Sequence, residues 1–486
     1  MIVKNYKKLL TNLINFSVEK YLILLLPLLF ITSGHGWGGD FALYIDQSFH
    51  LINGNLDELY THNYNLSQYK RLGPYFYPMG VPILISPVLS VFGLNFIALK
   101  LYAFLFWIGS IIFLKKTLTN ISSSKETVNL TVFFVSISYI YISHVNYILS
   151  DIYFFFFFNL WAFVITSKKK NQIRYLLFNG LLLFMLVIIR PTGIILVLSY
   201  LLFLIASFFL KKKHLTRFIP IVICCLLFLL YNRVFDFDFG SNEQEYILSN
   251  IDLNSILSNL RHYLVLLTSY FTDPIYYILT FLKVNDTYKT PLLFLFIGTI
   301  IYILKEVIRK QKIKNLVTNE STSLLIISCL SILSLYIILP MQNGIRFLFP
   351  IIPFLVFIFF TSIKNEFYRY TLVSLKIAFL FLMLFPGNIK LPEKNIETLN
   401  SLTAETTEVY DYIKAHLKIS DTISFFKPRV LRLYTNRTCL PETKESLNDS
   451  RFYLKHNQLS KDINVDENKY SKLIENKTLT LYKKLN

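Results

Sequence analysis

The sequence predicts a polytopic membrane protein built of α-helices and followed by a small α/β domain. Three observations support this fold class. Hydrophobic residues make up 54% of the 486 residues and charged residues only 16%, whereas soluble domains average about 25% charged residues. The apolar residues form long runs with lysine-rich breaks between them, as expected of helices that span a bilayer. The segment 387–486, in contrast, is polar.

The positive charge of the chain indicates topology rather than nucleic-acid binding. Its 49 basic and 30 acidic residues give a net charge of +19. The lysines lie in clusters at the ends of apolar runs, for example at 168–170 and 211–213. Such clusters stay on the cytoplasmic side of a membrane and attract anionic headgroups. We therefore expect membrane lipids, and no nucleic acid, as partners.

The four cysteines predict neither a disulfide framework nor a metal site. Cys224 and Cys225 are adjacent within one apolar run, Cys329 lies in another, and Cys439 stands alone near the C-terminus. This spacing is not that of metal ligands. At the N-terminus, lysines precede the first apolar run and no small-residue cleavage site follows it, which predicts a retained first helix.

Placing the basic clusters on the cytoplasmic side gives about eleven spans, with the N-terminus inside. Under this count, every basic cluster between spans falls on one side, except the pair Lys70 and Arg71. The second span is long enough to include a turn near Gly93. The expected spans are 21–33, 81–114, 128–143, 152–166, 175–189, 193–210, 218–231, 291–304, 323–340, 347–363 and 370–385.

Two long polar stretches and the tail are expected on the outer side. The stretches cover 34–80 and 232–290, and amphipathic sequence at 246–267 predicts helices that lie in the membrane interface. The transmembrane domain then extends over 1–386 and the tail domain over 387–486. Apolar spacing predicts the elements of the tail, namely a helix at 403–417 and strands at 421–426 and 478–482.

Ionisable residues at the outer membrane face are the candidates for function. The first is Asp40, which precedes an expected helix at 41–53 that Gly54 ends. One interpretation is structural, because aspartate is a preferred N-cap residue. The other is a functional carboxylate in a cleft. The two are compatible, since a cap also fixes the orientation of its side chain.

Two further segments have the same ambiguity. Tyr77 lies in the sequence Tyr-Phe-Tyr-Pro-Met-Gly-Val-Pro at 75–82, ahead of the second span. The prolines and the glycine also fit a plain helix entry with interfacial tyrosines. Asp151 follows Ser150 in a short outer turn, where it is either an N-cap of the fourth span or a functional acid.

Two arginines are expected on the outer side, against the trend for basic residues. Arg190 precedes Pro191 after the fifth span, and Arg346 precedes the tenth span. A structural interpretation is that each side chain extends to lipid phosphates at the interface. The functional interpretation is that their planar guanidinium groups clamp the phosphate of a lipid substrate.

These features are individually weak, but their order along the chain is more specific. In that order they are Asp40 after the first span, Tyr-Pro-x-Gly-x-Pro at 77–82, Ser150-Asp151, Arg190-Pro191, and Arg-x-x-x-Pro-x-x-Pro at 346–353. Together they resemble the GT-C superfamily of integral membrane glycosyltransferases, close to protein mannosyltransferases and the lipid A aminoarabinose transferase. The tail sequence Phe-Lys-Pro-Arg-x-Leu-x-Leu-Tyr-Thr-x-Arg at 426–437 looks similar to a tail on some bacterial members.

The resemblance implies a GT-C-like fold and a reaction. Such enzymes take a sugar from a polyprenyl-phosphate carrier on the outer face and transfer it, with inversion, to a glycolipid, lipid A or protein acceptor. The family's general base corresponds to Asp40, and a cation that stabilises the departing phosphate corresponds to Arg346 or Arg190. No cluster of metal ligands is visible, so no divalent metal is expected. The remaining candidates for substrate contacts are Tyr44, Tyr77, Asp151, Lys70 and Arg71.

One departure from the family pattern concerns the second acid. Many relatives have two adjacent acidic residues in the first outer loop, whereas here Phe41 follows Asp40 and the next carboxylate is Asp46.

The resemblance also implies a location in the plasma membrane of a bacterial cell. The N-terminus is then cytoplasmic and the tail domain extracytoplasmic.

Two other functions stay open, a flippase or transporter of lipid-linked sugars and an O-antigen-type polymerase. Transporters often have broken helices and internal repeats, whereas this chain has only 15 glycines and no evident repeat. A flippase also needs no carboxylate base at the outer face. Substitution of Asp40 separates these classes, because a transferase loses turnover but keeps carrier binding.

Overall fold

The computed structural model describes most of the chain. The described residues are 2–67, 76–122, 124–167, 172–211, 215–235, 251–281, 320–339, 344–363, 365–384, 400–460, 465–466 and 468–485. Lys70, Arg71 and the expected span at 291–304 lie outside them. The chain divides into two compact units, and each is described by itself.

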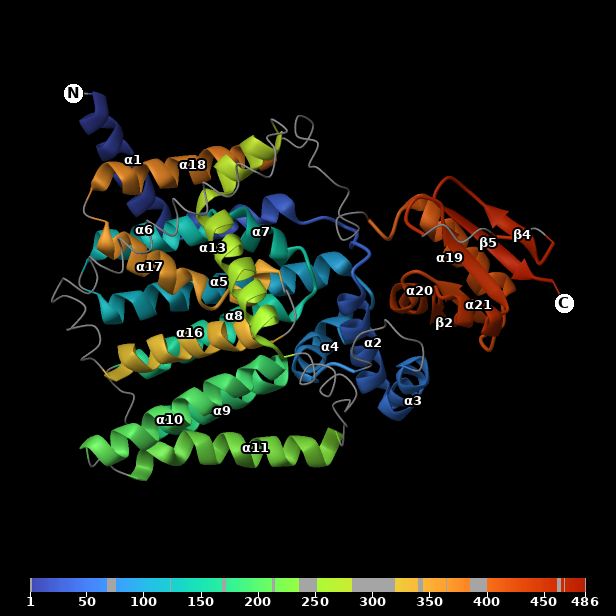
Figure 1. The fold of residues 1–486 in the computed structure, drawn as a ribbon, viewed down its shortest axis with the longest axis horizontal. Helices are drawn as coiled ribbons and strands as arrows, with labels where there is room; N and C mark the ends of the chain where they lie inside the picture. The colour runs from blue at the N-terminus through green and yellow to red at the C-terminus, as the bar shows by residue number, and fades with distance from the viewer. Residues whose placement is uncertain are drawn as a thin grey trace. The chain divides into compact units, whose positions relative to one another are not determined.

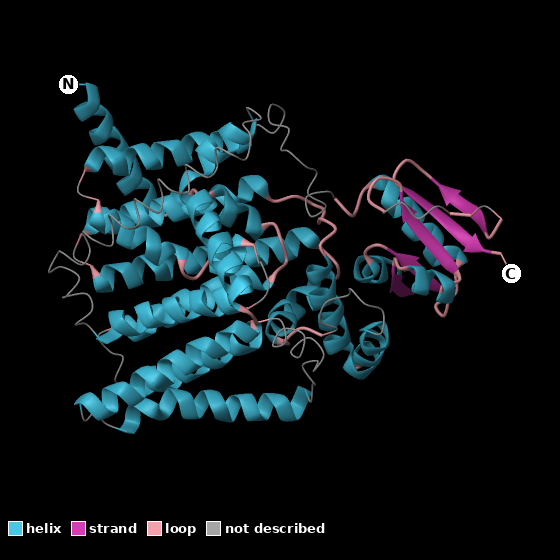
Figure 2. Cartoon of the chain, in the orientation of Figure 1, coloured by secondary structure: helices cyan, strands magenta, loops and turns pink. Residues whose placement is uncertain are grey.

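The first unit is a bundle of helices (Figures 1 and 2). It comprises Met1–Phe30, Ala103–Asn146 and Ser150–Pro392. Neighbouring helices pack in pairs such as α9 with α11, α10 with α16, and α6 with α17. Its elements are α1 (Ile2–Glu19), η1 (Leu22–Phe30), most of α5 (Phe96–Ile121), α6 (Lys125–Ser136), α7 (Tyr139–Val145), α8 (Ser150–Thr166), α9 (Ile173–Ile189), η2 (Pro191–Gly193), α10 (Ile194–Lys211), η3 (Leu215–Phe218), α11 (Ile219–Phe235), α13 (Leu253–Phe281), α16 (Glu320–Ile338), η5 (Ile345–Leu348), α17 (Ile352–Ser362) and α18 (Glu366–Leu384).

Several of these helices are long and apolar enough to cross a bilayer. Within the described residues there are four, or up to six if each of two bent helix pairs is one span. Four shorter apolar helices accompany them, among them α8 and α9. The predicted class, a polytopic helical membrane protein with a small α/β tail, is confirmed.

Two expected spans are each divided into two helices, the first at a predicted turn and the second without one. The expected span at 81–114 is α4 (Gly80–Phe92) followed by α5, and the helix is interrupted at Gly93, whose φ is +59°. That break lies where the sequence predicted a turn. The expected span at 128–143 is α6 and α7, which meet at an angle of 54°. The backbone between them is extended at Ser138, which ends the helical hydrogen-bond ladder.

The second unit contains the tail domain together with the first outer segment. It comprises Ile31–Tyr102, Tyr147–Leu149 and Glu393–Asn486. The expected tail helix and both expected strands are confirmed, as α19, β1 and β5. Its elements are α2 (Gly39–Asn53), α3 (Leu56–Ser67), α4, the start of α5, α19 (Ala404–His416), β1 (Thr422–Phe425), α20 (Pro428–Thr435), β2 (Thr438–Pro441), α21 (Lys444–Asp449), β3 (Phe452–His456), β4 (Tyr470–Glu475) and β5 (Leu479–Lys484).

The tail sheet is mixed, with strand order β2-β1-β3-β5-β4 (Figure 2). β1 runs parallel to β2 and to β3, whereas β5 is antiparallel to β3 and to β4. Short crossover segments with α20 and α21 join the parallel strands, as parallel pairing requires. The inner residues of β1 and β3 are buried, so the sheet forms the core of this domain.

The first outer segment is anchored to the tail domain by its residues 34–37. The Trp37 side chain is buried against Phe425, Phe426 and His456, with ring centroids 5.3–5.7 Å away. A Cβ at Gly34 would overlap the side chain of Asn400, so any other residue there would require that side chain to move. The two chain segments thus fold as one body.

His35 adds a buried polar connection to this anchor. Its Nε2 accepts a hydrogen bond from the Ile148 amide (3.2 Å), and its carbonyl accepts one from the Ser401 amide (2.7 Å). The ring stacks on Phe41 with centroids 3.7 Å apart. Burial lowers the pKa of His35 to about 3, so the imidazole is neutral in the folded protein.

The neutral His35 makes stability depend on pH. In the unfolded chain the imidazole has a pKa of about 6.5, so below that pH the unfolded state binds a proton that the folded state does not. The free energy of unfolding should therefore fall as the pH is lowered from about 6.5 towards 3. We expect the thermal midpoint of the purified protein to drop between pH 7 and pH 5, and to drop less in His35→Gln. An equal drop in both proteins would contradict this assignment.

Candidate functional site

Asp40 lies in the first turn of α2 and is not its N-cap. The cap position is Gly38, which makes no side-chain cap bond, and the helix begins at Gly39. The capping interpretation of Asp40 is therefore wrong, because the two glycines move the helix start ahead of the aspartate. Its carboxylate instead accepts a hydrogen bond from the Tyr77 hydroxyl, at 2.9 Å from Oδ1. The side chain is only half-buried and remains accessible to a substrate.

Tyr77 is held against α2 by neighbours on the same helix face as Asp40. Its ring stacks on that of Tyr44, with centroids 4.7 Å apart. Gln47 Nε2 donates to the Tyr77 carbonyl (2.8 Å), and Gln47 Oε1 accepts from the Tyr77 amide (3.2 Å). Asp40, Tyr44 and Gln47 are spaced i, i+4 and i+7, which places them along one face of a helix. The structure thus brings the predicted residues Asp40, Tyr44 and Tyr77 together.

The Tyr77 phenol is fixed in its neutral form. Burial raises its pKa well above the usual value, and the negative charge of Asp40 raises it further. A neutral hydroxyl keeps its proton and continues to donate to the carboxylate. The hydrogen bond orients Asp40, while the other lone pairs of the carboxylate are directed elsewhere.

A second face of α2 contacts α20 of the tail domain (Figure 1). Arg432 Nε lies 3.0 Å from Asp46 Oδ2, and the two side chains are 14% and 17% exposed. Arg429 lies one helical turn earlier, where its guanidinium carbon is 6.0 Å from the centre of the Tyr77 ring. α20 therefore places two cations along α2, one paired with Asp46 and one beside the Asp40–Tyr77 pair.

The first unit holds a separate ionic cluster around Asp151. Arg190 Nη1 lies 2.9 Å from Asp151 Oδ1, and both side chains are buried at 8% and 3% exposure. Arg346 Nη1 lies 3.9 Å from Asp151 Oδ2 and is 26% exposed. The Arg190 guanidinium also packs over the ring of Phe347, 4.3 Å from its centre. The structure thus brings three predicted residues together, Asp151, Arg190 and Arg346.

This cluster changes the interpretation of its members. A carboxylate paired with a buried guanidinium is a weak acceptor of a further proton. The interfacial interpretation of Arg190 is wrong, because its side chain is buried and paired instead of extending to the membrane surface. A role of Arg190 or Arg346 in binding a donor phosphate stays a prediction. So do the roles of Lys70 and Arg71, which lie outside the described residues.

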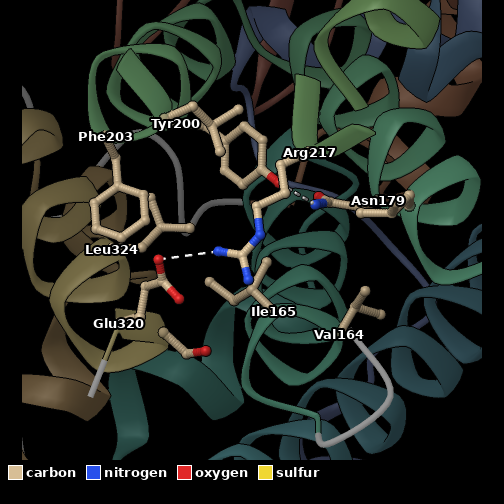
Figure 3. A pocket seen from close by; sticks show the side chains of 11 residues that line it. Val164, Ile165, Asn179, Tyr200, Phe203, Arg217, Glu320 and Leu324 are labelled. Carbon is tan, nitrogen blue, oxygen red and sulfur yellow. Dashed lines mark hydrogen bonds and ion pairs between the residues drawn. The ribbon is translucent and has the colours of Figure 1, made fainter. Parts of the chain in front are cut away.

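A pocket of about 450 Å³ lies among α8, α9, α10 and α16 of the first unit (Figure 3). Arg217 pairs with Glu320 across it (3.0 Å), and Asn179 donates to the Tyr200 hydroxyl (3.1 Å). Ile165 of its wall and Asp151 lie at opposite ends of α8, roughly 20 Å apart along the helix. The charges of Arg217 and Glu320 neutralise each other in this pocket. We therefore place the candidate chemistry at Asp40 instead.

Gln47 and Arg429 are site residues that the sequence reasoning missed. Gln47 had a detectable signal, since it lies two helical turns after Asp40. Arg429 belongs to the tail motif at 426–437, but its proximity to Asp40 had no signal, because the two residues are far apart in the chain and only the folded tail brings Arg429 to α2. For metals, within the described ranges no group of three His, Cys, Asp or Glu side chains could hold an ion.

Comparisons with known proteins support the fold. No protein-family model matches the chain, and no curated protein sequence matches it. Among solved structures, the chain is similar to ArnT from Cupriavidus metallidurans bound to undecaprenyl phosphate, with a TM-score of 0.51 at 11% identity, covering 96% of this chain and 98% of that one. It is also similar to the apo state of that protein, with a TM-score of 0.53 at 8% identity, covering 99% and 98%. The chain thus has a fold like that of these structures, as the resemblance implied.

The buried Asp151–Arg190 pair predicts a stability effect. Asp151→Asn or Arg190→Met leaves the partner charge buried without compensation, which typically costs about 3–5 kcal/mol. We expect both single variants to lower the thermal midpoint strongly and the double variant Asp151→Asn/Arg190→Met to lower it by less than the sum of the two. The measurement is thermal unfolding in detergent. Additive or negligible losses would show that the two side chains are not coupled.

Proposed function

We propose that this protein is a membrane glycosyltransferase that moves a sugar from a polyprenyl-phosphate carrier to an acceptor hydroxyl, with Asp40 as the general base. The observation that carries the proposal is the half-buried Asp40 carboxylate, oriented by the Tyr77 hydroxyl. The fold similarity to a transferase crystallised with undecaprenyl phosphate supports the class of donor. The acceptor is a glycolipid, lipid A or a protein.

The reaction follows from the chemistry of the leaving group. Asp40 accepts the proton of the acceptor hydroxyl while the acceptor oxygen forms a bond to the anomeric carbon. The bond from that carbon to the phosphate oxygen breaks on the opposite side, and its electron pair leaves with the phosphate, so the configuration inverts. One carboxylate base suffices, because a phosphate departs without needing a proton.

The surroundings of Asp40 fit this task. The hydrogen bond from Tyr77 fixes one carboxylate oxygen, which reduces the reorganisation needed when the acceptor binds. The stacked ring of Tyr44 and the two backbone hydrogen bonds between Tyr77 and the Gln47 side chain hold Tyr77 in turn.

The first test replaces the base without removing its hydrogen bond. In Asp40→Asn the amide oxygen still accepts from Tyr77, so folding and carrier binding should be preserved. Transfer should fall by about two orders of magnitude or more, as expected when a general base is lost. The measurement is sugar transfer from a polyprenyl-phosphate donor by purified enzyme.

Asp46→Asn is the matched control, with the same substitution on the same helix. Asp46 pairs with Arg432 rather than with Tyr77, so this variant should lose some stability and keep its turnover per folded molecule. Near-normal transfer by Asp40→Asn would exclude Asp40 as the base. Equal losses in both variants would attribute the effect to the docking of α2.

The proposed location is the bacterial plasma membrane, with the tail domain extracytoplasmic. Lysine clusters such as 168–170 support this orientation, because basic segments stay in the cytoplasm. A reporter enzyme that is active only outside the cytoplasm, fused after Asn486, should be active. Activity of a cytoplasm-only reporter at the same position would place Asp40 on the wrong side of the membrane for a donor presented outside.

A further inference from the structure

The tail domain contributes a cation to the surroundings of Asp40. The side chain of Arg429 lies against the start of α2, since a Cβ at Gly39 would meet its Cδ at 3.9 Å. Its guanidinium carbon is 6.0 Å from the centre of the Tyr77 ring, while the hydroxyl of that ring donates to Asp40. Arg429 therefore lies beside the Asp40–Tyr77 pair.

A displacement reaction needs a cation near the leaving phosphate as well as a base. In an inverting transfer, the base and the leaving phosphate lie on opposite sides of the anomeric carbon, so both groups border the same bound sugar. Arg429 lies beside the Asp40–Tyr77 pair and its side chain is half-buried, so it can be reached by a ligand.

The local electrostatics of α20 also favour an anion. Lys427 is the N-cap residue of this helix, Pro428 occupies the first turn, and no acidic residue follows there. The N-terminal end of a helix carries partial positive charge, which favours an anion close to it. Arg429 stands in the first turn, where its charge adds to that of the helix end.

Arg432 and Arg429 lie on the same helix but have different contacts, which distinguishes a residue that docks α20 on α2 from a residue that can bind a ligand. Arg432 lies three residues later on the same helix and is paired with Asp46 at 3.0 Å. It joins α20 to α2. Arg429 is instead directed towards the Asp40–Tyr77 pair.

We propose that Arg429 of the tail domain binds the phosphate of the polyprenyl-phosphate-linked donor and stabilises its departure. The inference rests on the proposed transferase function and deepens it, because it makes the tail domain part of the active site. The planar guanidinium of Arg429 donates two parallel hydrogen bonds to phosphate oxygens, and the single ammonium of lysine cannot reproduce this pair. The group that Arg429 binds is a phosphate. The alternative to the donor phosphate is a phosphate carried by the acceptor.

The test compares the same substitution at two positions of α20 in the full-length protein. Binding of undecaprenyl phosphate to purified Arg429→Lys should weaken about tenfold, equivalent to about 1.4 kcal/mol, and binding to Arg429→Gln should weaken further. Arg432→Lys keeps its charge beside Asp46 and should bind like the wild type. Thermal midpoints of all three variants establish that they are folded.

Steady-state kinetics then distinguish the source of the phosphate. A rise in the donor KM of Arg429→Lys, with the acceptor KM unchanged, supports the inference. Wild-type carrier affinity in both Arg429 variants, or a rise confined to the acceptor KM, overturns it. Failure of the wild-type protein to bind undecaprenyl phosphate is a different result, because it would overturn the proposed function itself.

Discussion

The hydrogen bond from the Tyr77 hydroxyl to the Asp40 carboxylate is the interaction on which the proposed chemistry depends. A carboxylate at the start of a helix often accepts hydrogen bonds from the first backbone amides and acts as the N-cap. Here two glycines precede Asp40, and the helix begins before the aspartate, so Asp40 is not the cap. Gln47 fixes the backbone of Tyr77 through both its amide and its carbonyl. The sequence Tyr-Pro-x-Gly-x-Pro therefore does more than begin α4, since it presents a phenol to the base.

The tail domain holds the first outer segment in place within the second unit. The buried Trp37 and His35 join the first outer segment to the tail core, and α20 packs along α2. A loop of this length with few apolar contacts of its own is expected to be mobile, whereas one packed on a folded sheet holds its side chains in place. The first unit shows a different use of charge, because one carboxylate, that of Asp151, lies between two guanidinium groups, those of Arg190 and Arg346.

Much of the fold could be predicted from the sequence, because apolar runs and basic clusters are local signals. The helices α8, α9 and α11 begin and end within a few residues of the expected spans, and the tail helix α19 and the strands β1 and β5 are found where apolar spacing placed them. The breaks between helices were predicted less well, since the extended backbone at Ser138 has no strong local signal. Asp40, Tyr44 and Tyr77 were identified from their motifs. The partners of Arg190 and the position of Arg429 could not be predicted, because both depend on contacts between segments far apart in the chain.

The most direct test of the central claim is an experimental structure of the protein with undecaprenyl phosphate bound. The account predicts that the phosphate lies within hydrogen-bond distance of Arg429 and that the space between this phosphate and the Asp40 carboxylate is wide enough for one sugar unit. The Tyr77 hydroxyl should still donate to Asp40 in that complex. A phosphate bound to the Arg190–Arg346 pair, with Arg429 and Asp40 remote from it, would contradict the account.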